Sequence, residues 1–249
     1  MARIRLIIIV ALMAATASDM SAQTDHGLWT EINIEREVNK RLDIGGGLEI
    51  RRRDYLKEAD RLSLELNASY KLNKWLRLNG GITLMEDNRY KVSGNLSKYS
   101  LYWSPRVRVT AGLTASQSFG KFTLSLRERW QYTYRPEMEV NRYWNYTDED
   151  DDIYEGDLAD RHTFGSKGKH AWRNRLQAKY KLSKMWRPYV NVETNVSHGL
   201  EKVHYAAGTE IRVTKHHVFD VKYLFQHSSN DDDNEGDRHI IGLGYSYKF

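Results

Sequence analysis

The sequence contains no cysteine. This absence excludes a disulfide framework, a zinc site built on thiolates and an anchor made by acylating a cysteine. Proline is scarce, with 3 residues in 249, and apolar residues at helical spacing are hard to find past the first twenty residues. The chain therefore has neither the covalent staples of a small secreted domain nor the pattern of a helical protein.

The sequence also lacks a concentrated patch of one charge. Lysine and arginine number 38 against 33 aspartate and glutamate, a net charge of +5. Such a balance suits nucleic-acid binding only if the basic residues gather in one footprint. Here they are spread through nearly every segment of the chain. We therefore expect no nucleic-acid partner.

Sequence fingerprints of catalysis are missing as well. No GxSxG, HExxH, phosphate-loop or dinucleotide motif is present. His216 and His217 are adjacent in "KHHV", so they point to opposite faces of a strand and make a poor chelate. His239 with Ser228 or Ser229 has no evident acid to orient it, which makes a lipid-modifying enzyme the weaker alternative. We expect no enzyme, no metal site and no cofactor.

The sequence has one long apolar run, "LIIIVALMAATA" at residues 6–17, which follows Arg3 and Arg5. A basic start, an apolar middle and the small residues of "MSAQ" are typical of a secretory signal peptide. About a dozen apolar residues are too few to cross a bilayer as a helix. The sequence therefore predicts a signal peptide over residues 1–22 and one exported domain over residues 23–249.

Alternation with a period of two dominates the exported part. In "RLSLELNASYKL", Leu62, Leu64 and Leu66 fall on one face and Arg61 and Glu65 on the other. About eleven such segments follow one another, most of them near the length with which a tilted strand crosses a bilayer. Their ranges are 28–38, 42–53, 61–72, 75–86, 105–118, 121–134, 171–182, 187–197, 202–213, 217–228 and 238–249.

Two kinds of connection join these segments. Five are short turns in which a small polar residue or glycine precedes lysine, as in "EVNKRLDI" at residues 37–44, and the others are long and polar. Transmembrane barrels have short periplasmic turns and long extracellular loops. The predicted fold is all-β: an up-and-down antiparallel transmembrane β-barrel of about 10–12 strands, with residues 135–168 forming a long acidic extracellular loop.

The number of segments raises a difficulty, because eleven is odd and single-chain bacterial barrels have even strand counts. Three explanations remain open. One segment is misassigned, residues 23–27 run back through the lumen, or a twelfth strand lies within residues 87–104.

A soluble β-sandwich would also alternate, so the direction of the apolar face needs separate evidence. Aromatic residues gather near the segment ends, such as Trp75 and Phe122 by the short turns and Trp29 and Trp103 by the long loops, as in membrane-interface girdles. The ending "RHIIGLGYSYKF" resembles the last strand of bacterial outer-membrane barrels, whose closing aromatic, here Phe249, is an insertion signal. We expect a cell outer membrane location, with membrane lipid, lipopolysaccharide and, through Phe249, the assembly machinery as partners. A soluble periplasmic β-barrel binding protein is the alternative.

The opposite face of the barrel strands then lines the lumen, and its charges are mostly positive. Paired side chains filling a narrow lumen would give a structural scaffold, the favoured interpretation. A wider lumen would be a porin-like narrow pore for a small anionic solute. The lumen-lining charged residues are predicted to be Glu31, Glu35, Glu49, Arg51, Arg53, Arg77, Arg106, Arg108, Arg127, Arg129, Arg173, Arg175, Glu193, Glu210, Arg212, Asp220, Lys222 and Arg238, with Arg61, Glu65 and Lys179.

Two further features do not follow the main pattern. Glu128 and Asn174 fall on the apolar face, either near the membrane surface or turned inward by a local bulge. The acidic runs at residues 148–160 and 230–237 do not have the spacing of a helix–loop–helix calcium site, so we interpret them as solvated loops.

Several stretches together resemble a known family. They are "GLWTEINIEREVNKRLDI" followed by "LEIRRR", then "LSLRERWQY", "WRNRLQAKYKL" and "YVNVETNV". In these stretches the chain is similar to the exported family named domain of unknown function 2490, over nearly the whole exported part. The resemblance implies an outer-membrane-type barrel and brings no catalytic residues. The insertion at residues 135–168 departs from the family's usual short loop.

Overall fold

The computed structural model describes residues 25–148, 150–229 and 236–249. The predicted signal peptide and most of the acidic run at residues 230–237 lie outside these ranges. No helix in the described part is long and apolar enough to cross a membrane. The strands are β1 (Asp25–Glu37), β2 (Leu42–Arg53), β3 (Glu58–Lys71), β4 (Leu76–Val92), β5 (Lys98–Phe119), β6 (Phe122–Arg135), β7 (Met138–Trp144), β8 (Leu158–Phe164), β9 (Lys167–Tyr180), β10 (Trp186–Val196), β11 (Leu200–Arg212), β12 (His217–Ser228) and β13 (Arg238–Lys248).

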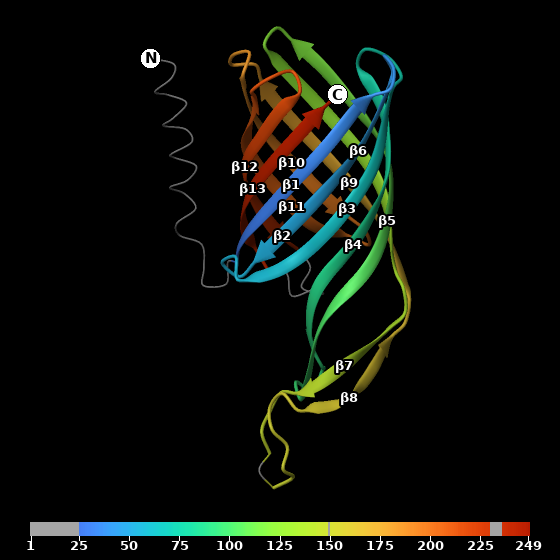
Figure 1. Ribbon diagram of the computed structural model, residues 1–249, viewed down its shortest axis with the longest axis vertical. Helices are drawn as coiled ribbons and strands as arrows, with labels where there is room; N and C mark the ends of the chain where they lie inside the picture. The colour runs from blue at the N-terminus through green and yellow to red at the C-terminus, as the bar shows by residue number, and fades with distance from the viewer. Residues whose placement is uncertain (1–24, 149, 230–235) are drawn as a thin grey trace.

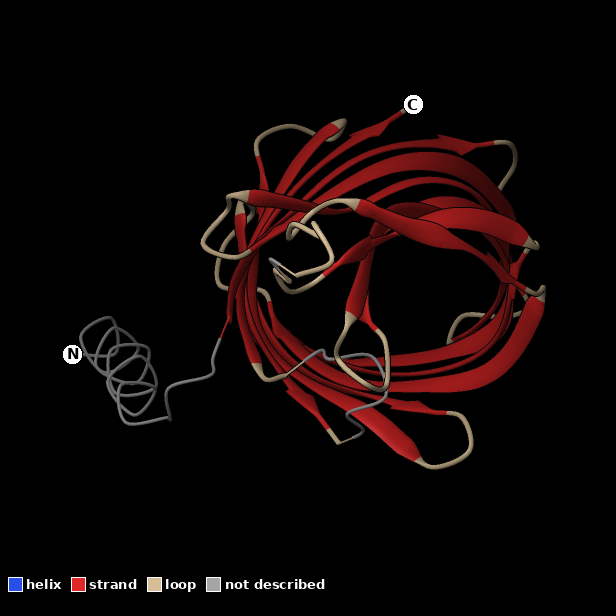
Figure 2. Ribbon diagram, turned by 90° about the horizontal axis from the view of Figure 1, so that it is seen from below, coloured by secondary structure: helices blue, strands red, loops and turns tan. Residues whose placement is uncertain are grey.

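All strands except β7 and β8 form one closed barrel, seen end-on in Figure 2. Around the ring the order is β4-β3-β2-β1-β13-β12-β11-β10-β9-β6-β5, and β5 pairs with β4 to close it. Each of the eleven segments with period-two alternation corresponds to one of these eleven barrel strands. The prediction of an all-β barrel of 10–12 strands is confirmed.

The odd number of strands is accommodated by one parallel pair. The first strand, β1, lies parallel to the last, β13, in a register that runs from Asp25 opposite Arg238 to Glu35 opposite Lys248. The other neighbours in the ring are antiparallel. Residues 25–27 belong to β1, so they do not run back through the lumen. We call the β1–β13 pair the parallel seam.

Residues 87–104 hold no twelfth barrel strand. Instead β4 and β5 continue past the barrel rim, paired as far as Val92 opposite Tyr99. The hairpin β7–β8 joins this extension through Lys98 opposite Trp144, and together they project from one end of the barrel (Figure 1). We call this projection the arm. Residues 135–168, predicted to form one long acidic loop, contain the two strands β7 and β8, each of seven residues and too short to cross a membrane.

The short turns at the opposite end, which we call the short-turn end, share one local device. The side chain before the lysine accepts hydrogen bonds from backbone N–H groups two and three residues later, at 2.9–3.2 Å, in four of the turns. Such side-chain turns tighten a hairpin without a left-handed backbone. In the fifth turn Gly120 occupies a positive φ of 61° instead. The residues whose side chains accept these hydrogen bonds are Asn39, Asn73, Ser183 and Thr214.

The apolar face of the barrel points outward. Leu64 is 52% exposed and Leu66 is 66% exposed, whereas Ser63, which lies on the opposite face of the same strand, is buried. The outward row continues around the ring with Ile32, Ile34, Leu48, Ile50, Leu62, Ile82, Leu84, Val107, Val109, Leu113, Leu124, Leu126, Leu176, Val190, Val192, Val221, Ile241 and Leu243. A soluble barrel would bury these side chains.

Glu128 and Asn174 interrupt this outward row. They lie directly opposite each other on β6 and β9, in a pairing without a register shift. The bulge that would turn them inward is therefore absent from this pair of strands.

Candidate functional site

The inward-facing side chains enclose a chamber of about 550 Å³ inside the barrel. It extends from Glu35 and Lys248 at the short-turn end to Trp29, Met85 and Leu224 further along the axis. Every barrel strand contributes to its lining. The chamber is therefore the hollow part of the lumen, and its volume is that of a site for a small molecule.

Beyond the chamber, toward the arm, the lumen is packed. Inward-facing Asp87, Ser104, Gln226 and Ile240, from four different strands, are 1–3% exposed. The apolar cluster Trp29, Ala206, Leu224 and Ile240 lies at the same end of the chamber. We call these side chains, with Gln131 and Ala171, the plug layer. These side chains are almost inaccessible to solvent, so they are packed against one another and against the barrel wall at this level.

Charged side chains make the polar half of the plug layer. The carboxylate of Asp87 accepts a hydrogen bond from Arg61, forms ion pairs with Arg89 and Arg106 at 3.2 Å, and is almost fully buried. Asp60 pairs with Arg53 at 3.5 Å. A buried carboxylate needs such partners, because an unpaired charge in this position would be costly.

Five arginines gather on one wall of the chamber, which we call the arginine wall. Arg127 of β6 lies directly opposite Arg175 of β9, and Arg129 lies directly opposite Arg173. Arg108 of neighbouring β5 completes the group. Like charges that face each other across strands repel and destabilise a sheet, so this wall needs compensation.

One carboxylate supplies part of that compensation. Glu193 of β10 is buried and accepts hydrogen bonds from both Arg127 and Arg173. Arg108 donates from Nε to the hydroxyl of Thr133 at 3.0 Å. Arg129 and Arg175 have no carboxylate of the described residues within ion-pair distance.

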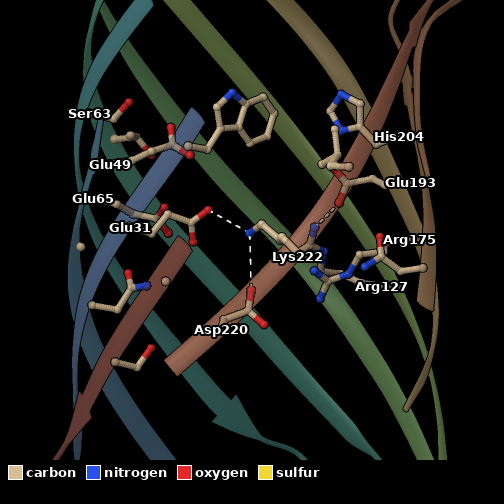
Figure 3. Close-up of a pocket in the computed structure, with 18 of the residues that line it drawn as sticks. Glu31, Glu49, Ser63, Glu65, Arg127, Arg175, Glu193, His204, Asp220 and Lys222 are labelled. Carbon is tan, nitrogen blue, oxygen red and sulfur yellow. Dashed lines mark hydrogen bonds and ion pairs between the residues drawn. The ribbon is translucent and has the colours of Figure 1, made fainter. Parts of the chain in front are cut away.

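The opposite wall is acidic. Figure 3 shows Glu31, Glu49 and Glu65 on one side of the chamber and Arg127 and Arg175 on the other. Arg51, Arg61 and Lys222 lie near these carboxylates, so this side of the chamber carries charges of both signs.

The acidic wall carries its own cations. Glu49 receives two hydrogen bonds from Arg51, at 2.8 and 2.9 Å, and Glu31 receives one from Lys222 at 3.2 Å. The side chain of Arg51 also lies over the Trp29 ring, 3.7 Å from its centre. These contacts hold the carboxylates against the wall.

Ion pairs in the lumen run around the wall rather than across it. Among the described residues, partners such as Arg127 and Glu193, or Lys179 and Glu210, sit on strands at most three places apart in the ring. Among the described residues these ion pairs do not bridge the chamber, which leaves an open volume of about 550 Å³.

Most of the predicted lumen residues line the chamber, and four lie elsewhere. Arg53 and Arg106 belong to the charged network at the plug layer. Arg238 pairs with Asp25 at 3.3 Å on the arm side. Arg77 pairs with Asp43 at 3.1 Å near the short-turn end. The residues that line the chamber are Glu31, Glu35, Glu49, Arg51, Arg108, Arg127, Arg129, Arg173, Arg175, Glu193, Glu210, Arg212, Asp220 and Lys222, together with Arg61, Glu65 and Lys179.

Sequence reasoning missed several uncharged members of the site. Trp29 was expected in the outer aromatic girdle, but it faces the lumen and its ring meets that of His204 edge-on at 6.0 Å. Tyr189 donates to the Asp220 carboxylate at 2.9 Å. For Trp29 a signal existed, since it shares strand parity with Glu31 rather than with Ile32.

The residues of the enzyme alternative do not come together. His239 contacts the hydroxyl of Tyr223 on the outer face, while Ser228 shares the inward parity of Gln226 on β12. Ser229 lies at the end of that strand, where its N–H donates to the carbonyl of Glu201. Within the described ranges, no three histidine, aspartate or glutamate side chains are arranged to hold a metal ion.

Comparison with known proteins gives a family and a fold. The family model described as "Protein of unknown function (DUF2490)" matches residues 26–237, and no curated protein matches. The β domain of the Bordetella autotransporter Brka superposes with a TM-score of 0.55 at 13% identity, covering 92% of this chain and 86% of that one. The translocator domain of the autotransporter NalP from Neisseria meningitidis gives 0.57 at 9% identity, covering 92% and 91%. At these identities the likeness concerns the fold, an outer-membrane-type barrel.

Proposed function

This chain belongs to the DUF2490 family of proteins of unknown function, and we propose that it is an outer-membrane barrel that rests closed. In this proposal the short-turn end faces the periplasm and the arm faces the cell exterior, as in other barrels of this type. The chamber then opens toward the periplasm only. The protein serves as a scaffold with a cation-rich internal chamber, and ions do not flow through it at rest.

The outward apolar face supports the membrane part of this proposal. Leucine, isoleucine and valine cover the outside of all parts of the ring, which suits acyl chains and would leave a soluble barrel with a large exposed apolar surface. Outer-membrane lipid and lipopolysaccharide are the partners that this surface fits.

The plug layer is the single observation that carries closure. Asp87, Ser104, Gln226 and Ile240 come from β4, β5, β12 and β13 and are nearly inaccessible. Conduction needs a continuous wet path, and a packed layer of buried side chains interrupts it.

Current recordings in planar bilayers test closure directly. The refolded protein, whose folded state is checked by its altered electrophoretic mobility before boiling, is expected to insert without producing steps of conductance. Steady steps from the unmodified protein would overturn the proposal.

A narrow anion pore is the second candidate, and the arginine excess in the chamber favours it. The same recordings separate the two, because a pore of this kind would conduct and would prefer chloride over potassium.

No catalytic role is included in the proposal. The separation of His239 from Ser228 on opposite faces supports this choice. Incubation with phospholipid is expected to release no fatty acid, and release above that of a boiled sample would contradict it.

A further inference from the structure

We propose that the arginine wall is a binding site for one compact oxyanion that carries two or more negative charges, of the phosphate type, taken up from the short-turn end. The inference rests on the closed chamber proposed above. It concerns what the chamber holds, not whether ions pass through the barrel.

The charge balance of the wall is the first observation. Five arginines face one buried carboxylate, Glu193, which is already bonded to Arg127 and Arg173. Arg129 and Arg175 are left without an acidic partner at ion-pair distance among the described residues. The wall thus holds two guanidinium groups that no carboxylate pairs directly, although Glu65 and Asp220 attract them from further away.

The arrangement of these charges is the second observation. Arg127 faces Arg175, and Arg129 faces Arg173, at successive inward positions of the same two strands. Each pair repels, and Arg173 is also repelled by Arg108 and Arg51. An anion between the guanidinium groups would turn this repulsion into attraction. A protein that needed only a wet lumen would gain nothing from stacking two such pairs.

The hydrogen-bonding capacity of the wall is the third observation. The Nε atoms of Arg127 and Arg129 are buried and have no hydrogen-bond partner, which is unusual for a buried donor. Arginine presents a planar fork of N–H groups that matches the oxygens of phosphate or carboxylate in pairs. Several forks on one wall favour a multivalent oxyanion over chloride.

The chamber and the plug layer limit the size of the bound anion and the route by which it enters. The chamber of about 550 Å³ admits a small solute and the plug layer stops an extended polyanion from threading through. Opposite Arg129 on β5 lies Gly112, where an added Cβ would be 2.4 Å from the carbonyl oxygen of Glu128, so no side chain occupies that place beside the wall. Lipid headgroups outside the barrel do not reach these inward-facing arginines.

Binding of inorganic pyrophosphate to the refolded protein in a zwitterionic detergent tests the site. Equilibrium dialysis with labelled pyrophosphate at low salt is expected to show saturation near one per chain, and chloride at equal ionic strength should compete poorly. Vesicles of phosphatidylglycerol should not compete, which separates a free phosphate from a phosphate on a lipid. Absence of saturation, or equal competition by these vesicles, would overturn the assignment.

The variants make the test specific. Arg129→Gln with Arg175→Gln is expected to weaken pyrophosphate binding about tenfold or more, since each lost charged hydrogen bond contributes on that scale. Arg77→Gln, which alters an arginine paired with Asp43 away from the wall, should bind like the unmodified protein. Equal weakening in both variants would contradict the site.

A stability measurement keeps the proposal testable if the double variant binds nothing. Without anion, the double variant should resist denaturant at least as well as the unmodified protein, because repulsion has been removed, and pyrophosphate should stabilise only the unmodified protein. If pyrophosphate does not stabilise the unmodified protein, the anion site is wrong, but the proposal that the barrel rests closed is unaffected. Conversely, a conducting barrel that still binds pyrophosphate would overturn closure and leave the anion site standing.

Discussion

Lys222 of β12 reaches across β13 to Glu31 of β1, with 3.2 Å between its Nζ and the Glu31 Oε1 (Figure 3). It passes over Gly242, where an added Cβ would lie 2.4–3.0 Å from three carbons of the lysine side chain. The missing side chain at Gly242 therefore makes room for a bridge over the parallel seam. Two directly paired contacts, Arg238 with Asp25 and Lys248 with Glu35, hold the ends of the same seam.

Replacing Lys222 with methionine should weaken the seam. The methionine keeps most of the aliphatic chain over Gly242 but loses the charged hydrogen bond to Glu31, at a cost of about 1–3 kcal/mol in the free energy of unfolding. Urea unfolding in lipid vesicles, followed by tryptophan fluorescence, measures it. The Glu31→Gln single variant and the double variant complete a cycle, and a coupling energy near zero would show that the bridge does not stabilise the seam.

An arginine on the outer face should impair insertion. Leu64 lies in the outward apolar row of β3, and Leu64→Arg places a charge against acyl chains at a cost of about 2–4 kcal/mol near the bilayer midplane. Reversible unfolding in vesicles gives the value. Tyr55→Arg, in the β2–β3 loop, is the matched control and should cost much less, so equal losses in the two variants would contradict a membrane-facing row.

Thinning the plug layer should open the barrel. Trp29→Ala with Ile240→Gly removes two large side chains of the apolar cluster in the plug layer. We expect steps of conductance that favour anions, because the arginine wall lies along the opened path. Leu243→Ala on the outer face serves as the control and should remain silent. A folded but silent double variant would place the barrier elsewhere.

Within the arm, attachment of the β7–β8 hairpin to the β4–β5 extension should weaken at low pH. The Asp160 carboxylate accepts bonds from Arg142, both at 2.6 Å, and from Lys98 at 3.0 Å, and these lower the pKa of Asp160 to about 2. Because the folded value lies below the ordinary one, the attachment is fully present above about pH 4 and is lost as pH falls through about 2. Asp160→Asn should loosen β8 already at neutral pH.

Spin labels can follow this change, because the chain has no cysteine of its own to interfere. Nitroxides on cysteines introduced at Gly94 and Glu155, in the turns of β4–β5 and β7–β8, report the distance between the two parts of the arm. Asp151→Asn is the control in the same loop. A distance distribution that stays narrow in Asp160→Asn would show that other contacts hold the two parts of the arm together.

Removing the last residue should affect assembly rather than stability. Phe249 is 64% exposed, and its backbone N–H donates to the carbonyl of Glu35 at 2.9 Å. Deletion of Phe249 should reduce the amount of barrel in the outer membrane of cells, while refolding into vesicles changes little. Unchanged amounts in cells would argue against recognition of Phe249 by the assembly machinery.

Alternation predicted the barrel well because bilayer and lumen impose opposite demands on alternate residues. Leu64 and Glu65 can be assigned to their faces from the sequence alone, and every barrel strand was found in this way. The face to which a residue points follows from alternation along its own strand, so it can be predicted without knowing which strands pair.

Pairing partners are not local, and there the sequence was less informative. The parallel register of β1 and β13 depends on how the ring closes, and the charge pairs that mark it, Asp25 with Arg238 and Glu35 with Lys248, are recognisable only once the two strands are known to be neighbours. The arm was missed because β7 and β8 are only seven residues long. The separation of a plug layer from a chamber depends on which inward side chains meet, as Trp29 and Ile240 do.

The parallel seam has a practical consequence for engineering. β1 begins at Asp25 on the arm side, and β13 ends at Lys248 on the short-turn side, so the two ends of the barrel lie a full strand length apart, about 40 Å for a 13-residue strand. In an even-stranded barrel a few added residues would join the ends and permit circular permutation. Here a linker would need more than ten residues and would have to run through acyl chains or through the chamber. Reordering this chain by permutation is therefore not feasible.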